Sequence, residues 1–264
     1  MKTVKNVFDY LNTLAPTTLK MDFDNVGLLV GNGENTVKKC LLALDVTDAV
    51  INEAIEKGAE LIVSHHPIIF HAINSVCADD LVGRKIIKLV QNDISVISMH
   101  TNLDIAEGGV NDALMSVLGG SVSGFLEPCG TDIGGKDVGC GRIGELSKEM
   151  PFGDFLTCCK DALHSDGLRY HDAGLPVKKL AVMGGSGGDC VKLAKMLGCD
   201  TYVTSDIKYN AFLDASELGI NLIDADHFCT ENVIIPVLCE KLSTEFADIS
   251  FMISERHQQT VHFF

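Results

Sequence analysis

The pattern that most constrains the fold of this chain is an apolar strand, a capped helix and a second apolar strand in quick succession. Residues 38–45 are almost continuously apolar, and residues 47–57 form a helical segment with Thr47 as its N-cap and Gly58 as its stop. Residues 61–63 are apolar again. Two strands joined by a helix pair in parallel. The sequence therefore predicts a β-helix-β unit and an α/β fold.

The same pattern recurs 140 residues later. Sliding the chain by that distance aligns VKK at 37–39 with VKK at 177–179, and Gly58 with Gly198, without a gap. The second β-helix-β unit covers residues 180–206. In each copy a further helix and an apolar strand follow, the strands being residues 94–99 and 220–223. Duplication of one α/β unit accounts for these matches better than chance.

We therefore predict a first repeat at residues 1–124 and a second at residues 125–264. Residues 124–176 contain candidate strands at 141–146 and 168–171 and a helix at 152–163, and these elements need partners from both halves. The expected fold is two intertwined, duplicated α/β domains. Each has a mixed, mainly parallel sheet flanked by helices.

Two adjacent histidines end the second strand of the first repeat. His65 and His66 are followed by Pro67, which cannot continue the hydrogen-bonded ladder, so they lie where the strand becomes a loop. Successive strand-like side chains point in opposite directions, so the pair could serve two neighbouring metal ions. An isolated pair of adjacent histidines is more often an ordinary loop feature. The other candidate ligands in this chain favour a metal site instead.

A histidine followed by an acid four residues later comes after the next strand in both repeats. These pairs are His100 with Asp104 and His227 with Glu231. A spacing of four places a nitrogen and an oxygen ligand on one side of a helical turn. In an α/β sheet the carboxyl ends of the strands share one edge, so the pairs are expected to converge with the two adjacent histidines.

The chemistry of this donor set favours transition metals. Imidazole and carboxylate together suit Zn, Fe, Mn or Ni, and are too rich in nitrogen for Ca or Mg. Six ligands exceed the need of one tetrahedral ion, but they fit two divalent metal ions per subunit that share a carboxylate. The sequence does not distinguish among these metals.

Composition excludes several other classes of function. The chain has 264 residues, 46% of them hydrophobic, so it can bury a large core, and it has neither a secretion signal nor an apolar run long enough to cross a membrane. A cytoplasmic protein is expected. A net charge of −15 disfavours nucleic acid and anionic membranes. Ten cysteines without a C-x-x-C pair are expected to be reduced, mostly buried thiols.

Weaker signals leave alternatives open. Asp24 and Asn25 could close a turn or contribute to a site. The glycine-rich residues 184–188 could cradle a phosphate or form a tight strand-to-helix turn. Lys208 and Tyr209 are candidate substrate-binding groups. The other histidines have no matching partners and are predicted to be structural or exposed: His71, His164, His171, His257 and His262.

Seven motifs spread over nearly the whole chain resemble one known family, the NIF-three-like dinuclear metal-binding proteins, which are homologues of type 2 GTP cyclohydrolase I. The motifs are DNVGLLVG at 24–31, ALDVT at 43–47, SHHP at 64–67, HTNLD at 100–104, GRIG at 141–144, TSD at 204–206 and HxxxE at 227–231. The resemblance implies intertwined α/β domains and a homohexamer built as a trimer of dimers. It also implies two divalent metal ions facing an internal cavity.

Carried over by motif, the resemblance assigns His65, Asp104 and Glu231 to one ion. It assigns His66, His227 and the bridging Glu231 to the other, with His100 beside them as a further ligand or supporting group. The sequence departs from the family pattern at three positions, where Ser205 and Asp226 replace glycines and Asn210 replaces a histidine. None of them removes a metal ligand, but the last two bear on substrate preference and metal geometry.

Two functions of different classes remain. The first is a metal-dependent hydrolase that activates water, with GTP implied by the resemblance and with His100 and Asp206 as candidate proton-transferring catalytic groups. Its partner would be a nucleotide or another phosphorylated small molecule. The second is a non-catalytic metal-handling or regulatory scaffold, because a fold and a metal site do not determine a substrate.

Overall fold

The computed structural model describes residues 1–264 as two compact units, each assembled from separate parts of the chain. Unit 1 contains Met1–Leu103 and Ile235–Gln258, and unit 2 contains Asp104–Ile234 and Gln259–Phe264. Each unit has a mixed sheet with helices around it. The sheet of unit 1 is mainly parallel and the central strands of the unit 2 sheet are parallel, so the predicted α/β fold class is confirmed. The units are defined by packing, whereas the boundary at residues 124 and 125 separates sequence repeats and stays a prediction.

Unit 1 is built on a five-stranded sheet in the order β1-β4-β3-β2-β13. Its strands are β1 (Gly27–Val30), β4 (Ser95–Ser98), β3 (Leu61–Ser64), β2 (Lys39–Ala43) and β13 (Ser250–Ile253). All neighbouring pairs are parallel except β1 and β4, which are antiparallel. The parallel pairing of β2 with β3 confirms the first predicted β-helix-β unit.

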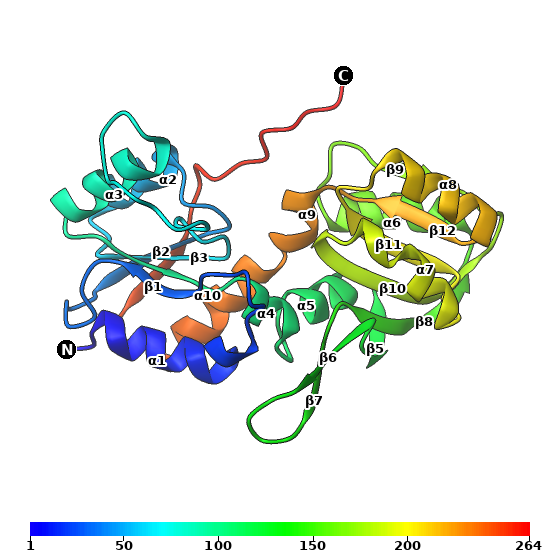
Figure 1. Ribbon diagram of the computed structural model, residues 1–264, viewed down its shortest axis with the longest axis horizontal. Helices are drawn as coiled ribbons and strands as arrows, with labels where there is room; N and C mark the ends of the chain where they lie inside the picture. Colours follow the sequence, from blue (N-terminus) through cyan, green and yellow to red (C-terminus); the bar gives the residue numbers. More distant parts are fainter. The chain divides into compact units, whose positions relative to one another are not determined.

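Helices cover both faces of this sheet. They are α1 (Val4–Leu14), the 3₁₀ turn η1 (Thr17–Leu19), α2 (Asp48–Lys57), α3 (Leu81–Gln91) and α10 (Ile234–Glu245). Figure 1 shows α2 and α3 on one side of the unit 1 sheet and α1 and α10 on the other. All residues of β3 and β4 are buried, as expected for parallel strands between two helical layers.

Local sequence signals set the ends of the unit 1 helices. Thr47 caps α2 by accepting a hydrogen bond from Val50 N, and Gly58 ends the helix in the left-handed conformation at φ 66°, both as predicted. The first helix begins after Thr3, whose side chain forms a capping box with Asn6. It ends at Leu14, shorter than the predicted residues 1–20.

Unit 2 is built on a six-stranded sheet in the order β5-β8-β10-β11-β12-β9. Its strands are β5 (Gly120–Gly124), β8 (Arg142–Met150), β10 (Val177–Ser186), β11 (Thr201–Ser205), β12 (Asn221–Asp224) and β9 (Arg169–His171). β10, β11 and β12 are parallel, which confirms the second β-helix-β unit. β8 pairs antiparallel with both β5 and β10. A separate hairpin joins β6 (Glu127–Thr131) to β7 (Asp137–Cys140).

The helices of unit 2 pack around this sheet and surround one apolar core. They are α5 (Val110–Val117), α6 (Phe152–Ala162), the 3₁₀ turn η2 (Gly188–Cys190), α7 (Val191–Met196), α8 (Tyr209–Leu218) and α9 (His227–Glu231). Side chains of α5 and α6 meet Leu180, Val182 and Val203 of the sheet in the core. A short helix, α4 (Thr101–Ile105), lies at the boundary between the units in sequence. No helix is both long enough and apolar enough to span a bilayer.

Candidate metal centre

Three histidines come together at the carboxyl ends of two neighbouring strands of unit 1. His65 and His66 directly follow β3, and His100 follows the adjacent strand β4. The ring centroids are 5.0 Å apart for His65 and His66, 5.2 Å for His65 and His100, and 5.4 Å for His66 and His100. One nitrogen from each ring lies within 4.8 Å of the others, so the cluster could hold a metal ion.

Each of the three rings is oriented through its Nδ1 atom. His65 Nδ1 lies 2.8 Å from the carbonyl oxygen of Met99, His66 Nδ1 lies 2.8 Å from Asp45 Oδ1, and His100 Nδ1 lies 2.8 Å from Asp24 Oδ1. Because these oxygens only accept hydrogen bonds, Nδ1 is the protonated nitrogen and Nε2 carries the lone pair. This is the arrangement that fixes a histidine as a metal ligand.

Asp24 is a support for His100 in addition to closing a turn. Its Oδ2 accepts hydrogen bonds from the amide and the hydroxyl of Thr101, and its Oδ1 also accepts one from Asn25 N. Burial acts to raise the pKa of Asp24, but the hydrogen bonds from His100 and Thr101 outweigh it and hold the pKa well below its usual range. Of the two interpretations left open by the sequence, the site role applies to Asp24, as a support for His100. The turn at residues 21–24 is closed by the backbone bond from Asp24 N to the carbonyl oxygen of Met21.

Asp104 lies on α4, one helical turn after His100. Its backbone oxygen accepts a hydrogen bond at 2.9 Å from Asn111 Nδ2, and the next two carbonyls, of Ile105 and Ala106, accept from Arg142. The guanidinium of Arg142 is buried, and it also pairs with Asp112 at 2.7 Å. Arg142, which is part of the GRIG motif, thus anchors the segment that presents Asp104.

In unit 2 the second histidine and acid pair occupies the two ends of the short helix α9. His227 Nε2 lies 3.1 Å from Glu231 Oε2, and His227 Nδ1 lies 2.8 Å from Asp206 Oδ2. Burial would lower the pKa of His227, but its hydrogen bonds and ion pairs with Glu231 and Asp206 outweigh it and raise the pKa to about 9. The contact between His227 and Glu231 therefore favours positive charge, which a proton or a metal cation could supply.

Two strained backbone positions flank His227. Asp206 has φ 53° and Asp226 has φ 75°, values that glycine adopts more readily than other residues. A glycine at the position of Asp226 would adopt this conformation without strain. In this chain the Asp226 side chain compensates by capping α9 through Cys229 N and by accepting a hydrogen bond from Gln259. Ser205, the other departure from glycine, is buried and donates to the carbonyl oxygen of Gly185.

The glycine-rich segment supports the site and does not form a phosphate cradle at a helix N-terminus. β10 continues to Ser186, and Gly184 N and Gly185 N already donate to Asn111 Oδ1 and Thr230 Oγ1. Gly185 has φ 66°, and a Cβ atom there would lie 2.1 Å from Glu231 Oε1. Of the two alternatives, the segment therefore fits the tight turn. The missing side chain at Gly185 leaves room for Glu231.

Sequence reasoning missed two members of the network around His66. Asp45 accepts from His66 and also from His257, whose Nε2 lies 3.1 Å from Asp45 Oδ2. His257 was predicted to be structural or exposed; it is structural, and its link to Asp45 was missed because a partner over 200 residues away leaves no local signal. Asp45 could have been found, since it lies two residues after strand β2 just as His66 lies two residues after β3.

Six of the residues named from the sequence are thus brought together, three within each unit. His65, His66 and His100 form the cluster in unit 1, and His227, Glu231 and Asp206 form the cluster in unit 2. Lys208 precedes α8 and Tyr209 begins it, two to three residues after Asp206. Histidine and carboxylate groups that are buried or half-buried could therefore hold metal ions, and their donor atoms fit the transition metals expected from the sequence.

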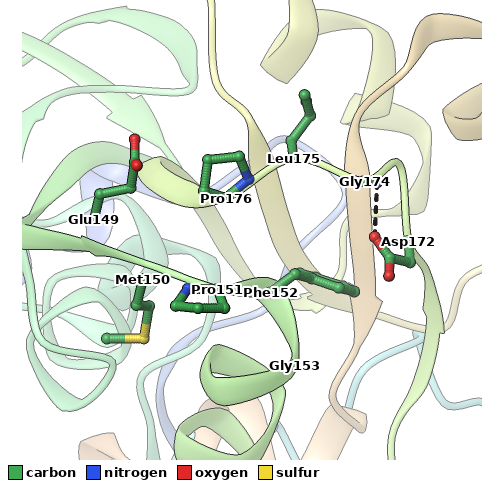
Figure 2. A pocket seen from close by; sticks show the side chains of 9 residues that line it. All are labelled: Glu149, Met150, Pro151, Phe152, Gly153, Asp172, Gly174, Leu175 and Pro176. Atoms are coloured by element: carbon green, nitrogen blue, oxygen red, sulfur yellow. Dashed lines mark hydrogen bonds between the residues drawn. The ribbon is translucent and has the colours of Figure 1, made fainter.

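A surface pocket of unit 2 is lined by none of these residues. Figure 2 shows its lining, in which the Asp172 carboxylate accepts a hydrogen bond from Gly174 N at 2.7 Å. The pocket has a volume of about 410 Å³ and is lined by Glu149, Met150, Pro151, Phe152, Gly153, Asp172, Gly174, Leu175 and Pro176. It has carboxylates but no histidine, cysteine or basic side chain, so it offers neither the candidate ligands nor a phosphate-binding group.

Known proteins resemble this chain along nearly its entire length. A protein of Clostridium perfringens (strain 13 / Type A) named GTP cyclohydrolase 1 type 2 homolog is 38% identical over 262 residues, covering 98% of this chain and 99% of its own. The protein of the same name from Clostridium acetobutylicum is 40% identical over 240 residues, covering 90% and 89%.

Solved structures agree with these relatives. The Bacillus cereus protein related to NIF3 matches with a TM-score of 0.92 at 25% identity, covering 100% of both chains. A hypothetical protein of Staphylococcus aureus matches with a TM-score of 0.92 at 31% identity, covering 99% of both. The family model described as Duf34/NIF3 (NGG1p interacting factor 3) matches residues 2–260. The chain therefore belongs to the Duf34/NIF3 family.

Proposed function

We propose that this protein is a metal-dependent hydrolase with a dinuclear centre. In this proposal His65, Asp104 and Glu231 bind one divalent ion, and His66, His227 and Glu231 bind the other, with Glu231 as the bridge. His100 supplies a further ligand or a support. The ligands must be deprotonated to bind, so metal binding would release protons and depend on pH.

The observation that carries the proposal is the common orientation of four histidines. His65, His66, His100 and His227 each have Nδ1 within 2.8 Å of a carbonyl or carboxylate oxygen. A histidine that serves only packing has no need of such a partner in every instance, whereas metal-binding histidines almost always have one. The pattern also includes histidines from both clusters.

Hydrolysis is the chemistry that best suits this donor set. When bound, two such ions supply positive charge that polarises a substrate and acidifies a coordinated water. The chain has a net charge of −15, which repels anions, and the positive charge of the ions would counter this repulsion locally. A phosphorylated substrate could then bind. Asp206 and His100 would hold or move protons beside the substrate. The names of the relatives make GTP the first nucleotide to test, with ring opening at C8 and release of formate.

The experiment is turnover of GTP by the full-length protein loaded with Fe, Mn or Zn, with formate and phosphate measured in the same sample. Glu231→Gln is the control, and metal content is measured for it and for His66→Ala. Metal-dependent formate release that E231Q lacks supports the cyclohydrolase reaction, while phosphate alone points to a phosphohydrolase. Full metal content in both variants would refute the dinuclear centre.

A non-catalytic role in metal handling or regulation is the alternative outcome of the same experiment. Bound metal that exchanges readily, with no turnover in any metal form, would favour it. A homohexamer and a cytoplasmic location belong to the proposal too. Light scattering on the purified protein tests the first, expecting about six times the chain mass of 28.4 kDa. The ten free cysteines support a reducing compartment.

A further inference from the structure

His257 lies just beyond the last strand of unit 1 and contacts the carboxylate that orients His66. Its Nδ1 lies 3.3 Å from the amide nitrogen of Leu44, and its Nε2 lies 3.1 Å from Asp45 Oδ2. Because an amide can only donate, Nδ1 is the acceptor and Nε2 is the nitrogen that donates to Asp45. The imidazole therefore bridges the residue before Asp45 and the Asp45 side chain.

Asp45 is held from both sides by this arrangement. Its Oδ1 accepts from His66 Nδ1 at 2.8 Å while its Oδ2 accepts from His257. The side chain of Asp45 is 43% exposed, whereas that of His257 is only 6% exposed. An aspartate this open to water could rotate or hydrate in place of bonding His66, and the buried imidazole restricts that freedom.

The backbone that presents His257 is itself anchored to α2. The carboxylate of Glu53, which is buried, accepts hydrogen bonds from the hydroxyl of Ser254 and from the amides of Glu255 and Arg256. His257 N then donates to the hydroxyl of Ser254 at 3.1 Å. The imidazole is thus fixed by a continuous set of contacts within unit 1.

We propose that His257 is a positioning residue for the metal centre. By holding Asp45, it keeps His66 in the tautomer and orientation that bind metal. It thereby sets the affinity of one of the two metal positions, the one to which His66 belongs. This inference rests on the proposed dinuclear centre and assigns a specific role there to the C-terminal segment of unit 1.

The test compares two variants that separate the two hydrogen bonds of the imidazole, the one accepted from Leu44 N and the one donated to Asp45. In His257→Asn the amide oxygen can replace Nδ1 as the acceptor for Leu44 N, but no donor reaches Asp45. In His257→Gln the longer side chain restores a donor to Asp45. Metal-depleted full-length proteins are titrated with Co²⁺, followed by its visible absorption, and with Zn²⁺ in competition with a chelating dye. H66A identifies the position in question.

We expect H257N to weaken one metal position by about 10- to 100-fold and to change the Co²⁺ absorption of that position alone. H257Q should bind close to wild type, and the melting temperatures of the metal-free variants should agree. Wild-type affinity in H257N, an equal loss in H257Q, or equal weakening of both positions would overturn the inference while leaving the dinuclear centre intact. A wild-type protein that binds neither metal would instead refute the proposed function together with this inference.

Discussion

Replacing Glu53 with Gln tests whether a buried carboxylate ties the C-terminal segment to α2. Glu53 forms an ion pair with Lys57 at 2.7 Å and accepts from Ser254, Glu255 and Arg256. Gln keeps one oxygen acceptor but removes the charge. Unit 1 should therefore lose stability, although its apolar core is unchanged.

The size of this loss follows from the pKa of Glu53. Burial acts to raise the pKa, but the hydrogen bonds from Lys57, Ser254 and the two amides outweigh it and lower the pKa from 4.5 to about 2. At 1.36 kcal/mol per pKa unit, the folded state gains roughly 3 kcal/mol near neutral pH. Because the folded pKa is depressed, this contribution is fully present above pH 4.5 and is lost as the pH falls toward 2.

The assay is urea denaturation of both proteins at pH 7 and pH 3, followed by circular dichroism. We expect E53Q to lower the free energy of unfolding by up to about 3 kcal/mol at pH 7, and the difference to shrink by about 2 kcal/mol at pH 3. Glu56→Gln is the control. It makes the same charge change on the same helix, but Glu56 is exposed and its pair with Arg256 contributes little.

Two results would refute this reasoning. If E53Q and E56Q have the same small effect at pH 7, the buried contacts of Glu53 do not stabilise the segment. If E53Q is destabilised equally at pH 7 and pH 3, the loss is steric or local and does not arise from the ionised carboxylate.

Three further substitutions address the metal centre. Gly185→Ala should lower the metal content found by elemental analysis, because its Cβ would lie 2.1 Å from Glu231 Oε1. Gly174→Ala is the control, because Gly174 has a similar φ of 74° but open space around it, and it should leave the metal content unchanged. Arg142→Lys should lower the free energy of unfolding by about 2–4 kcal/mol, measured by urea titration, because Lys cannot replace the guanidinium bonds to four carbonyls and Asp112. Asp206→Asn, which keeps an acceptor oxygen but removes the charge, should weaken Zn²⁺ binding by about 10- to 100-fold in a dye-competition titration, and unchanged affinity would show that His227 does not depend on the charge of Asp206.

Local patterns in the sequence predicted the repeating elements of this fold. Thr47 and Gly58 mark the ends of α2 because capping and left-handed stops depend on a few neighbouring residues. The parallel pairing of β2 with β3 and of β10 with β11 followed from strands joined by single helices. The strand β13 and the β6–β7 hairpin were not predicted. β13 gains its place only by pairing with β2, more than 200 residues earlier in the chain.

The candidate ligands could be identified from the sequence because they follow strand ends, and because the histidine and acid pairs repeat with a spacing of four residues. The contacts of their supports could not be predicted, because Asp24, Asp45, His257 and Arg142 reach the ligands or their helices from distant parts of the chain. The sequence alone thus determined the α/β class, the repeated unit and the chemical type of the site. Only the tertiary structure decided which oxygen orients each imidazole, since a hydrogen bond depends on distances that local sequence patterns do not encode.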